Sequence, residues 1–310
     1  MGRGALRHLF IINRHAGKKE SWKTISSQLD ALRAPNLSVR YTSCRGDATA
    51  IAREFVGQSD EFARIYACGG DGTLNEVIRG VYDLKNCAVA PVPIGSGNDF
   101  IRSFPFERED FLNIKSLIGG EILEVDLLRC GEHISCNSVT IGYDCAVAKN
   151  VEKFKRLRLI TSSFAYKLSI FYCLINGRKH LFKIITDGRE IKNDGTYLLS
   201  VCAKGKYYGG GIKCSPKADN SDGYIDFMCV KTVGVLKFVS LLPTFVKGGH
   251  IDNPRFDFVE HKKCRTVEYI SERETEIGVD GEIIPVRRAK IEVLPKAVII
   301  IVPNKMSGSV

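Results

Sequence analysis

The 310-residue sequence lacks an apolar run long enough to cross a bilayer. Its longest apolar stretches, residues 164–175 and 235–246, are interrupted by Lys167 in the first and by Lys237 and Pro243 in the second. A membrane-spanning helix needs about 20 consecutive apolar residues. The apolar segment near the N-terminus is also too short for a signal peptide. We therefore predict a protein that stays in the cytoplasm.

Paired cysteines are missing as well. The eleven cysteines are an odd number and form no CxxC motif, so neither a disulfide framework nor a cysteine-ligated metal is indicated. Cys68, Cys87, Cys202 and Cys229 lie within apolar runs, where a thiol behaves as a small hydrophobic side chain. This use of cysteine is typical of a reducing compartment.

Acidic residues are fewer than basic ones: the chain has 35 Asp and Glu but 45 Lys and Arg, and its formal net charge is +10. The excess favours a polyanionic partner, which could be ATP, nucleic acid or an anionic lipid surface, and charge alone does not choose among them. Apolar residues make up 44% and charged residues 26% of the chain, as in a folded, non-spanning protein. The length favours two domains.

The first part of the chain alternates apolar runs with helical patterns, which predicts a mostly parallel sheet flanked by helices. The predicted strands are residues 9–12, 38–42, 64–68, 88–93 and 122–128, and the predicted helices are 21–33, 47–56, 74–81 and 108–118.

After residue 129 the pattern changes to short runs of β-branched and aromatic residues separated by Gly, Asn and Asp, which predicts an antiparallel domain. Its predicted strands are 133–138, 183–186, 196–203 and 224–231, and its predicted helices are 154–176 and 233–246. We thus predict an α/β domain over residues 1–129 and a β domain over 130–296, with a strand at 297–303 that fits either.

A glycine-rich turn stands between a predicted strand and a predicted helix, where residues 68–76 read Cys-Gly-Gly-Asp-Gly-Thr-Leu-Asn-Glu. Backbone N–H groups at the start of such a helix favour an anion. Glycines allow phosphate oxygens to approach closely, Thr73 can cap the helix or donate to phosphate, and Asp71 can hold magnesium through water. Three glycines around one aspartate are more specific than an isolated GxGxxG. The alternative is an ordinary tight turn.

Two further turns follow predicted strands. Residues 93–100, Pro-Ile-Gly-Ser-Gly-Asn-Asp-Phe, place the Ser96 hydroxyl and the Asp99 carboxylate at the same predicted sheet edge. Residues 13–17, Asn-Arg-His-Ala-Gly, follow the first strand and precede two lysines. Two phosphate-type turns at one sheet edge predict a single nucleotide site. The turn at 13–17 is by itself equally compatible with an ordinary loop.

Together these turns resemble the diacylglycerol kinase catalytic domain family, which includes bacterial lipid kinases and the sphingosine kinases. The family's GGDGTxNEV motif matches residues 69–77, its GTxNDF loop matches 95–100, and its NPxxG turn matches 13–17. Further matches, in the family's order, are Thr42 with residues 46–48, the segment 216–224, and residues 280–282. The sequence departs from the family at Arg14, which replaces a proline, and at Ser96, which replaces a threonine.

The resemblance implies an ATP-dependent kinase that phosphorylates a hydroxyl of a membrane lipid such as diacylglycerol. It implies a Rossmann-like nucleotide domain, a C-terminal antiparallel β-sandwich, and an active site in the cleft between them. The implied ATP-binding residues are Asn13, Arg14, His15, Ala16, Gly17, Thr42, Gly69, Gly70, Asp71, Gly72, Thr73, Leu74, Asn75, Glu76 and Ser96. Asp71, Asp99 and Asp126 are implied to act in catalysis through Mg2+ and its water network.

Phosphoryl transfer also needs a group that accepts the proton of the attacking hydroxyl. Glu282 is our candidate, because glycines flank its strand end and it matches the family's catalytic glutamate. The alternative is a hairpin turn with solvated carboxylates.

The resemblance further implies a structural Mg2+ held by Asp219, Asp222 and the backbone of Tyr224. An Asx-rich turn has the same sequence pattern.

The predicted partners are a lipid substrate and an anionic membrane surface, bound peripherally at the inner face of the membrane, with no nucleic acid. A basic, aromatic helix at 151–176 suits contact with headgroups, although it is equally compatible with core packing. The loop at 204–211 combines cations, aromatics and glycines, as expected for a substrate cleft or a long hairpin connection. A homodimer through a sheet edge of the second domain is left open.

Two other functions are kept as alternatives. An NAD kinase-type phosphotransferase of the same superfamily also carries a GGDG turn, but Asn75, Glu76 and the loop at 95–100 favour the lipid branch. A nucleic-acid-binding module rests on the charge alone. The sequence does not identify which lipid is phosphorylated.

Overall fold

The computed structural model describes residues 6–32, 36–155, 169, 172–173, 179–192 and 196–304. The chain forms two compact units, which we call unit 1 (Met1–Leu127 with Pro295–Val310) and unit 2 (Leu128–Leu294). Both divisions fall inside strands, so β5 (Glu121–Cys130) and β14 (Glu282–Val302) contribute residues to both units. The chain therefore enters unit 2 once and returns to unit 1 near its end.

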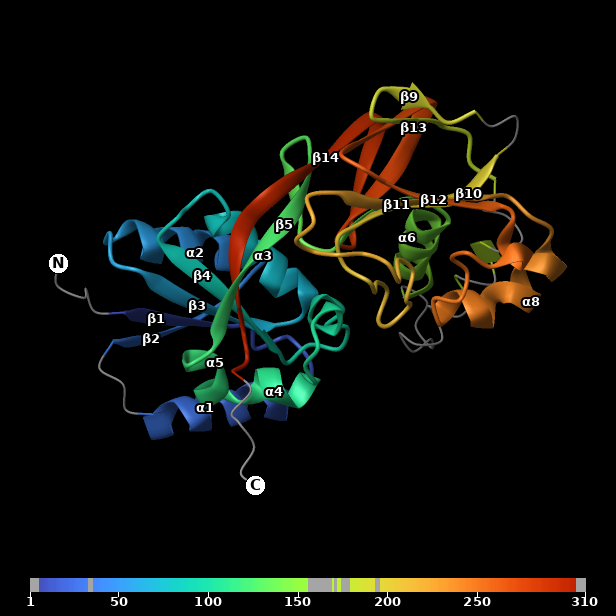
Figure 1. The fold of residues 1–310 in the computed structure, drawn as a ribbon. Coiled ribbons are helices and arrows are strands. Elements are labelled where there is room, and N and C mark those ends of the chain that lie inside the picture. Colours follow the sequence, from blue (N-terminus) through green and yellow to red (C-terminus); the bar gives the residue numbers. More distant parts are fainter. Residues whose placement is uncertain are drawn as a thin grey trace. The chain divides into compact units, whose positions relative to one another are not determined.

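Unit 1 is a parallel sheet with helices on both faces. Besides β5 and β14 its elements are β1 (Arg7–Ile12), α1 (Lys19–Leu32), β2 (Leu37–Tyr41), α2 (Asp47–Gly57), β3 (Ala63–Gly69), α3 (Asp71–Val81), β4 (Cys87–Pro93), the 3-10 helix η1 (Phe100–Ser103), α4 (Arg108–Leu112) and α5 (Ile114–Ile118). Figure 1 shows α1, α4 and α5 on one side of the sheet and α2 and α3 on the other. Strands β3 and β4 are nearly all apolar and buried, as expected for a parallel sheet covered on both faces.

The strand order of unit 1 brings three strand ends together. The order is β14-β4-β3-β1-β2, and Ile65 of β3 lies in register with Leu9 of β1 and Val89 of β4. Because β1, β3 and β4 are parallel neighbours, the turns that follow them leave the sheet at the same edge.

Unit 2 is mainly antiparallel, with the strand order β12-β11-β10-β7-β13-β14. Its elements are β6 (His133–Ser135), β7 (Ser138–Gly142), α6 (Tyr143–Lys155), β8 (Lys183–Thr186), β9 (Arg189–Glu190), β10 (Tyr197–Ala203), β11 (Ile225–Lys231), α8 (Val235–Val246), the 3-10 helix η2 (Pro254–Phe256), β12 (Val259–Cys264) and β13 (Thr266–Val279). Alternate residues of β11 face two different cores. Phe227 and Cys229 pack with residues of β13 and β14, whereas Met228 and Val230 pack with residues of α6 and α8.

The fold class predicted from the sequence is confirmed, and the differences are local. The predicted helix 108–118 is two short helices, because Asn113 interrupts it and its side chain accepts a hydrogen bond from the Ser116 N–H at 3.3 Å. The predicted strand 133–138 is broken between β6 and β7. The predicted strand 297–303 is the end of β14, whose Ile300 pairs with Val89 of β4 in unit 1.

Two expectations concern helices in unit 2. Helix α6 begins at Tyr143, a position that the sequence did not suggest, and the predicted helix 154–176 lies almost wholly outside the described residues. The predicted helix 233–246 is α8, with Pro243 inside it.

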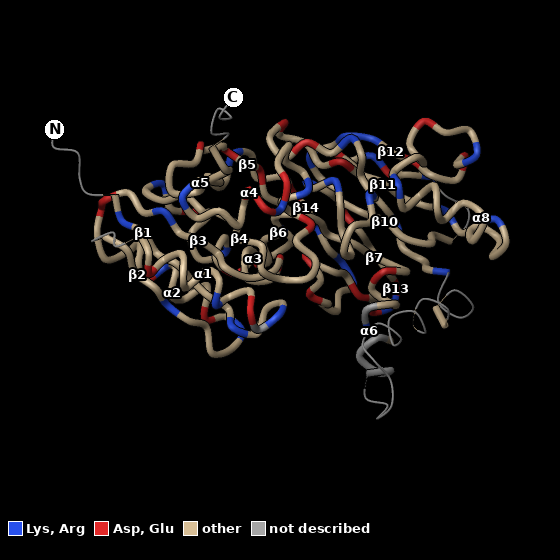
Figure 2. The backbone as a smooth tube through the Cα atoms, turned by 90° about the horizontal axis from the view of Figure 1, so that it is seen from below, with Lys and Arg blue, Asp and Glu red and all other residues tan. Residues whose placement is uncertain are grey.

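Among the residues that the structure describes, no helix combines the length and the apolar composition needed to cross a bilayer. Figure 2 shows Lys and Arg interspersed with Asp and Glu along the chain in both units.

Candidate active site

The three turns predicted from the sequence meet at one edge of the unit 1 sheet. The Gly95 N–H donates to the Gly69 carbonyl at 3.0 Å, and the Asn13 N–H donates to the Cys68 carbonyl at 2.9 Å. The side-chain amide of Asn13 donates to the Thr73 hydroxyl at 3.0 Å. Hydrogen bonds thus join the first turn to the second and the second to the third.

Glycine is required where these turns touch. A Cβ added to Gly95 would overlap the Cα of Gly70 and lie 2.9 Å from its nitrogen, so the two backbones are in direct contact. Gly17 has φ of 66°, and a Cβ there would overlap the carbonyl oxygen of Ile94. The glycines therefore fix the spacing between the turns as well as leaving room above them.

The N-terminus of α3 lies within this cluster of turns. Its N-cap residue is Gly70, which offers no side chain to cap the helix. The first N–H groups of a helix carry partial positive charge and form a ready anion site. The Asp71 carboxylate, in the first turn, accepts a hydrogen bond from the Phe100 N–H at 3.1 Å, which ties α3 to the turn after β4.

The other two candidate catalytic aspartates of unit 1 are buried. Asp99 is only 5% exposed and lies 3.5 Å from the Arg102 guanidinium. Asp126 is fully buried, and its carboxylate accepts a hydrogen bond at 2.8 Å from the N–H of Lys296, whose φ is 49°. Asp126 thus supports the backbone where β14 crosses into unit 1.

The remaining ATP-binding candidates lie around the same turns. Thr42 follows β2 and its N–H donates to the Ile12 carbonyl at 3.1 Å. Asn75 is buried in α3, the carbonyl of Glu76 accepts from the Thr49 hydroxyl at 2.8 Å, and Ser96 is exposed. Residues of unit 1 that the sequence assigned to ATP are therefore neighbours in the fold.

Arg14, which stands where the family has proline, does not disturb the first turn. The His15 N–H donates to the Asn13 side-chain oxygen at 2.9 Å, and the Ala16 N–H donates to the Asn13 carbonyl at 3.2 Å. These bonds form an Asx turn without the help of proline. The Arg14 guanidinium lies 3.7 Å from the centre of the Tyr41 ring and 5.3 Å from that of Trp22, a cation–π arrangement.

Glu282, the candidate base, belongs to unit 2 and opens β14 after a two-residue hairpin turn. Asp280 and Gly281 have φ of 45° and 87°, as in a type I′ turn, and Glu282 pairs with Val279. The Asp280 carboxylate accepts hydrogen bonds from the Ser135 hydroxyl at 2.7 Å and from the backbone N–H groups of Cys136, Asn137 and Ser138 at 2.8, 3.1 and 2.8 Å. The half-buried Asp280 carboxylate is thus held by protein donors, and the half-buried Glu282 stays a predicted base.

The predicted magnesium ligands of unit 2 lie in an acidic loop, residues 219–224, where each of them has a protein partner. Asp219 accepts from the N–H and the hydroxyl of Ser221, both at 2.9 Å. The ammonium group of Lys204 lies 2.9 Å from an Asp222 carboxylate oxygen and 2.7 Å from the Tyr224 carbonyl oxygen, and Lys263 forms a second ion pair with Asp222. In the described part of the chain, no three His, Cys, Asp or Glu side chains are grouped so that they could hold a metal ion.

Charge explains why the loop takes this form. Burial disfavours the charged form of Asp222, but hydrogen bonds from Lys263 and Lys204 hold the pKa of its carboxyl below the ordinary value. Two ammonium groups already compensate this one carboxylate. No local pattern indicates these pairings, because Lys204 lies 18 residues before Asp222 and Lys263 lies 41 residues after it.

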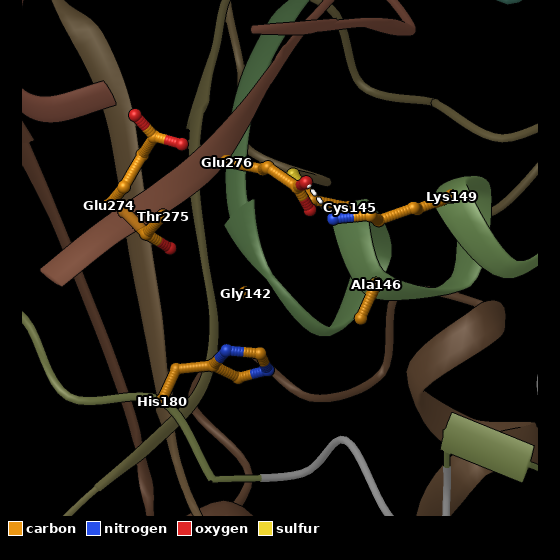
Figure 3. A pocket seen from close by; sticks show the side chains of 8 residues that line it. All are labelled: Gly142, Cys145, Ala146, Lys149, His180, Glu274, Thr275 and Glu276. Atoms are coloured by element: carbon orange, nitrogen blue, oxygen red, sulfur yellow. Dashed lines mark hydrogen bonds and ion pairs between the residues drawn. The ribbon is translucent and has the colours of Figure 1, made fainter. Parts of the chain in front are cut away.

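A cavity of about 240 Å³ in unit 2 was also not foreseen (Figure 3). It is lined by Gly142, Cys145, Ala146, Lys149, His180, Glu274, Thr275 and Glu276. Figure 3 shows Lys149 of α6 directed at Glu276 of β13, with which it forms an ion pair.

Asp144 precedes Cys145, one of the residues that line this cavity. Its carboxylate accepts a hydrogen bond from the Tyr208 hydroxyl at 2.9 Å, and burial raises the pKa of Asp144 to about 6. The local signal for Asp144 is a carboxylate two residues after the glycine that ends the buried strand β7.

Comparison with protein families assigns both parts of the chain. Residues 7–130 match the model of the diacylglycerol kinase catalytic domain, and residues 137–302 match that of the YegS C-terminal NAD kinase beta sandwich-like domain. The chain therefore belongs to the diacylglycerol kinase family of lipid kinases.

Individual relatives agree with this assignment. The diacylglycerol kinase of Bacillus subtilis (strain 168) is 28% identical over 79% of this chain and 78% of its own length. The diacylglycerol kinase of Staphylococcus saprophyticus is 27% identical over 89% of this chain and 88% of its own. A crystal structure of a diacylglycerol kinase from Bacillus anthracis str. Sterne has the same fold, with a TM-score of 0.70 and 22% identity over 96% of this chain and 97% of that one.

Proposed function

We propose that the protein transfers the γ-phosphate of ATP to the hydroxyl of diacylglycerol or a closely related membrane lipid, giving phosphatidic acid or a related phospholipid. The observation that carries this proposal is the junction of three turns at the uncapped N-terminus of α3, in a chain that belongs to a lipid kinase family. In the proposal unit 1 binds ATP and unit 2 binds the lipid.

The residues of the turns have defined tasks in this proposal. The N–H groups at the start of α3 and the Gly69–Gly72 backbone bind phosphate oxygens, and the Asn13 side chain orients the Thr73 hydroxyl beside them. Backbone donors of this kind are fixed before the reaction, so they stabilise developing charge without reorganising.

Asp71 and Asp99 are suited to hold the magnesium ion that accompanies ATP. They belong to two turns whose backbones are in contact, and carboxylate oxygens are the ligands that Mg2+ prefers. When bound, the ion neutralises charge on the transferring phosphate. Asp126, whose hydrogen bond to Lys296 supports the backbone, is proposed to belong to the same network.

Glu282 is proposed as the base that accepts the proton of the lipid hydroxyl. The Asp280–Gly281 turn fixes the residue at the first position of β14, and Asp280 anchors that turn to residues 135–138 through four hydrogen bonds. A carboxylate on a rigid strand end loses little freedom when it positions a hydroxyl group.

We also propose that the protein meets its substrate as a peripheral membrane protein of the cytoplasmic leaflet. The net charge of +10 favours an anionic surface, where each Lys or Arg contributes about 1 kcal/mol. We do not propose a homodimer through the unit 2 sheet. Its edge strand β12 carries Lys262 and Lys263, and edge lysines disfavour strand pairing.

The test is an assay with γ-labelled ATP and a panel of acceptors: diacylglycerol, phosphatidylglycerol, a sphingoid base and a polyprenol in mixed micelles, and NAD and RNA in solution. We expect label transfer to one of the lipids, with diacylglycerol preferred. Transfer to NAD alone would favour the NAD kinase-type alternative. Sedimentation with vesicles adds the membrane test, since binding should need anionic lipid and weaken between low and high salt.

A further inference from the structure

Lys204 is a buried cation that contacts the acidic loop of unit 2. It directly follows β10, its N–H donates to the Asn137 carbonyl at 2.9 Å, and its side chain is fully buried. A buried charge is tolerated only when it is paired and hydrogen bonded. The ammonium group meets this condition at the Asp222 carboxylate and the Tyr224 carbonyl, at 2.9 and 2.7 Å.

These two oxygen atoms belong to the residues that the resemblance assigned to a structural magnesium ion. The distances fit an ammonium group, whereas Mg2+ binds oxygen at about 2.0–2.1 Å and keeps several waters around it. An ion and the Lys204 nitrogen cannot both occupy the point between the two oxygens. Lys263, on β12, adds a second positive charge to Asp222.

The third expected ligand is also engaged. The Asp219 carboxylate accepts two hydrogen bonds from Ser221, which close an Asx turn at the start of the loop. All three residues therefore have protein partners that give the loop its shape.

We propose that the ammonium group of Lys204 takes the place of a structural magnesium ion, so that unit 2 folds around a covalently attached cation and needs no divalent metal. Divalent ions then serve only the nucleotide. This inference concerns the stability of unit 2 and does not rest on which lipid is phosphorylated.

A first experiment uses the unmodified full chain without nucleotide. Its melting temperature should be the same in EDTA and in millimolar Mg2+, because an ion that binds the folded state would raise it. Asp219→Asn serves as the control: the amide oxygen keeps the Asx turn, whereas the negative charge that strengthens binding of a divalent ion is lost. A Mg2+-dependent rise in melting temperature that Asp219→Asn abolishes would overturn the proposal.

A second experiment removes the cation. Lys204→Met keeps most of the side-chain volume but leaves Asp222 and the Tyr224 carbonyl without the buried ammonium, so the melting temperature should fall by roughly 10 °C. The matched control is Lys217→Met, since Lys217 is half-exposed and pairs with Asp252 at the surface, where an ion pair contributes little. Equal melting temperatures for Lys204→Met and the unmodified protein would also overturn the proposal.

Discussion

The turns of unit 1 and the acidic segments of unit 2 both matched family motifs, yet the two units use their aspartates differently. In unit 1 the backbone shapes the site: glycines let the turns touch, and the half-buried Asp71 carboxylate accepts a hydrogen bond from the Phe100 N–H. In unit 2 the aspartates hold the fold: Asp280 binds four donors and Asp222 binds two lysines. A motif match thus shows where a carboxylate stands in the sequence. The hydrogen-bond donors and cations around that carboxylate in the fold indicate whether it is available for catalysis or stabilises the structure.

This difference predicts that removing Asp280 is the most damaging single change to stability. Asp280→Ala would leave a buried hydroxyl and three buried N–H groups without their acceptor, so we expect a loss of about 4 kcal/mol in the free energy of unfolding. Denaturant unfolding measures it. Asp257→Ala, at an exposed ion pair with Lys237, should leave the free energy of unfolding nearly unchanged. Similar small losses in both variants would contradict the structural role of Asp280.

The opposite behaviour is expected of Asp71. Asp71→Ala should lower kcat by roughly 100-fold or more while the protein stays folded, because it removes a charged group needed in the transition state. Circular dichroism and steady-state kinetics together measure this. Asp83→Ala, which breaks an exposed ion pair with Arg53 in the same unit, should leave kcat unchanged. Near-normal turnover in a folded Asp71→Ala protein would remove Asp71 from the site.

A third change tests whether the backbone of unit 1 carries the site. In Gly95→Ala the new methyl group would press on the Gly70 backbone, which should cost about 1–3 kcal/mol of stability and weaken ATP binding. Gly57→Ala is the control, because nothing lies within 4 Å of a Cβ at that helix end. If ATP affinity is the same in both variants, contact between the two turns is not needed for binding.

The smallest expected effect is a change in pH dependence from Asp144. Its pKa is about 6 in the folded protein against an ordinary value of 3.8, so between these pH values the folded state holds a proton that the unfolded state has lost. Asp144 therefore destabilises the protein progressively as pH rises from about 4 to 6. Asp144→Asn should remove this loss of stability. Compared with the unmodified protein, the variant should therefore gain a few degrees in melting temperature at pH 7 that it does not gain at pH 4. Melting profiles that stay parallel to those of the unmodified protein would contradict the assigned pKa.

Much of unit 1 could be predicted because its signals are local. Apolar runs of strand length and helical periodicity give the βα alternation, and parallel neighbours must end at a common edge, so the turns after β1, β3 and β4 could be grouped from the sequence. The Asp-Gly pair at residues 280–281 likewise indicated a hairpin. The start of α6 at Tyr143 was missed, because the buried strand β7 ends at Gly142 and runs directly into the helix.

The sequence by itself determined the order of the elements, the glycines at the turns and the family, since each depends on residues close together in the chain. Only the tertiary structure decided which groups the aspartates bind. Asp280 reaches residues more than 140 positions away, and Asp126 lies 170 positions from Lys296. The cations of Asp222 are Lys204, directly after β10, and Lys263, on β12. Such pairings depend on how the fold brings distant segments together. Opposite charges attract equally whatever their separation along the chain, so no local sequence pattern predicts which of them will pair.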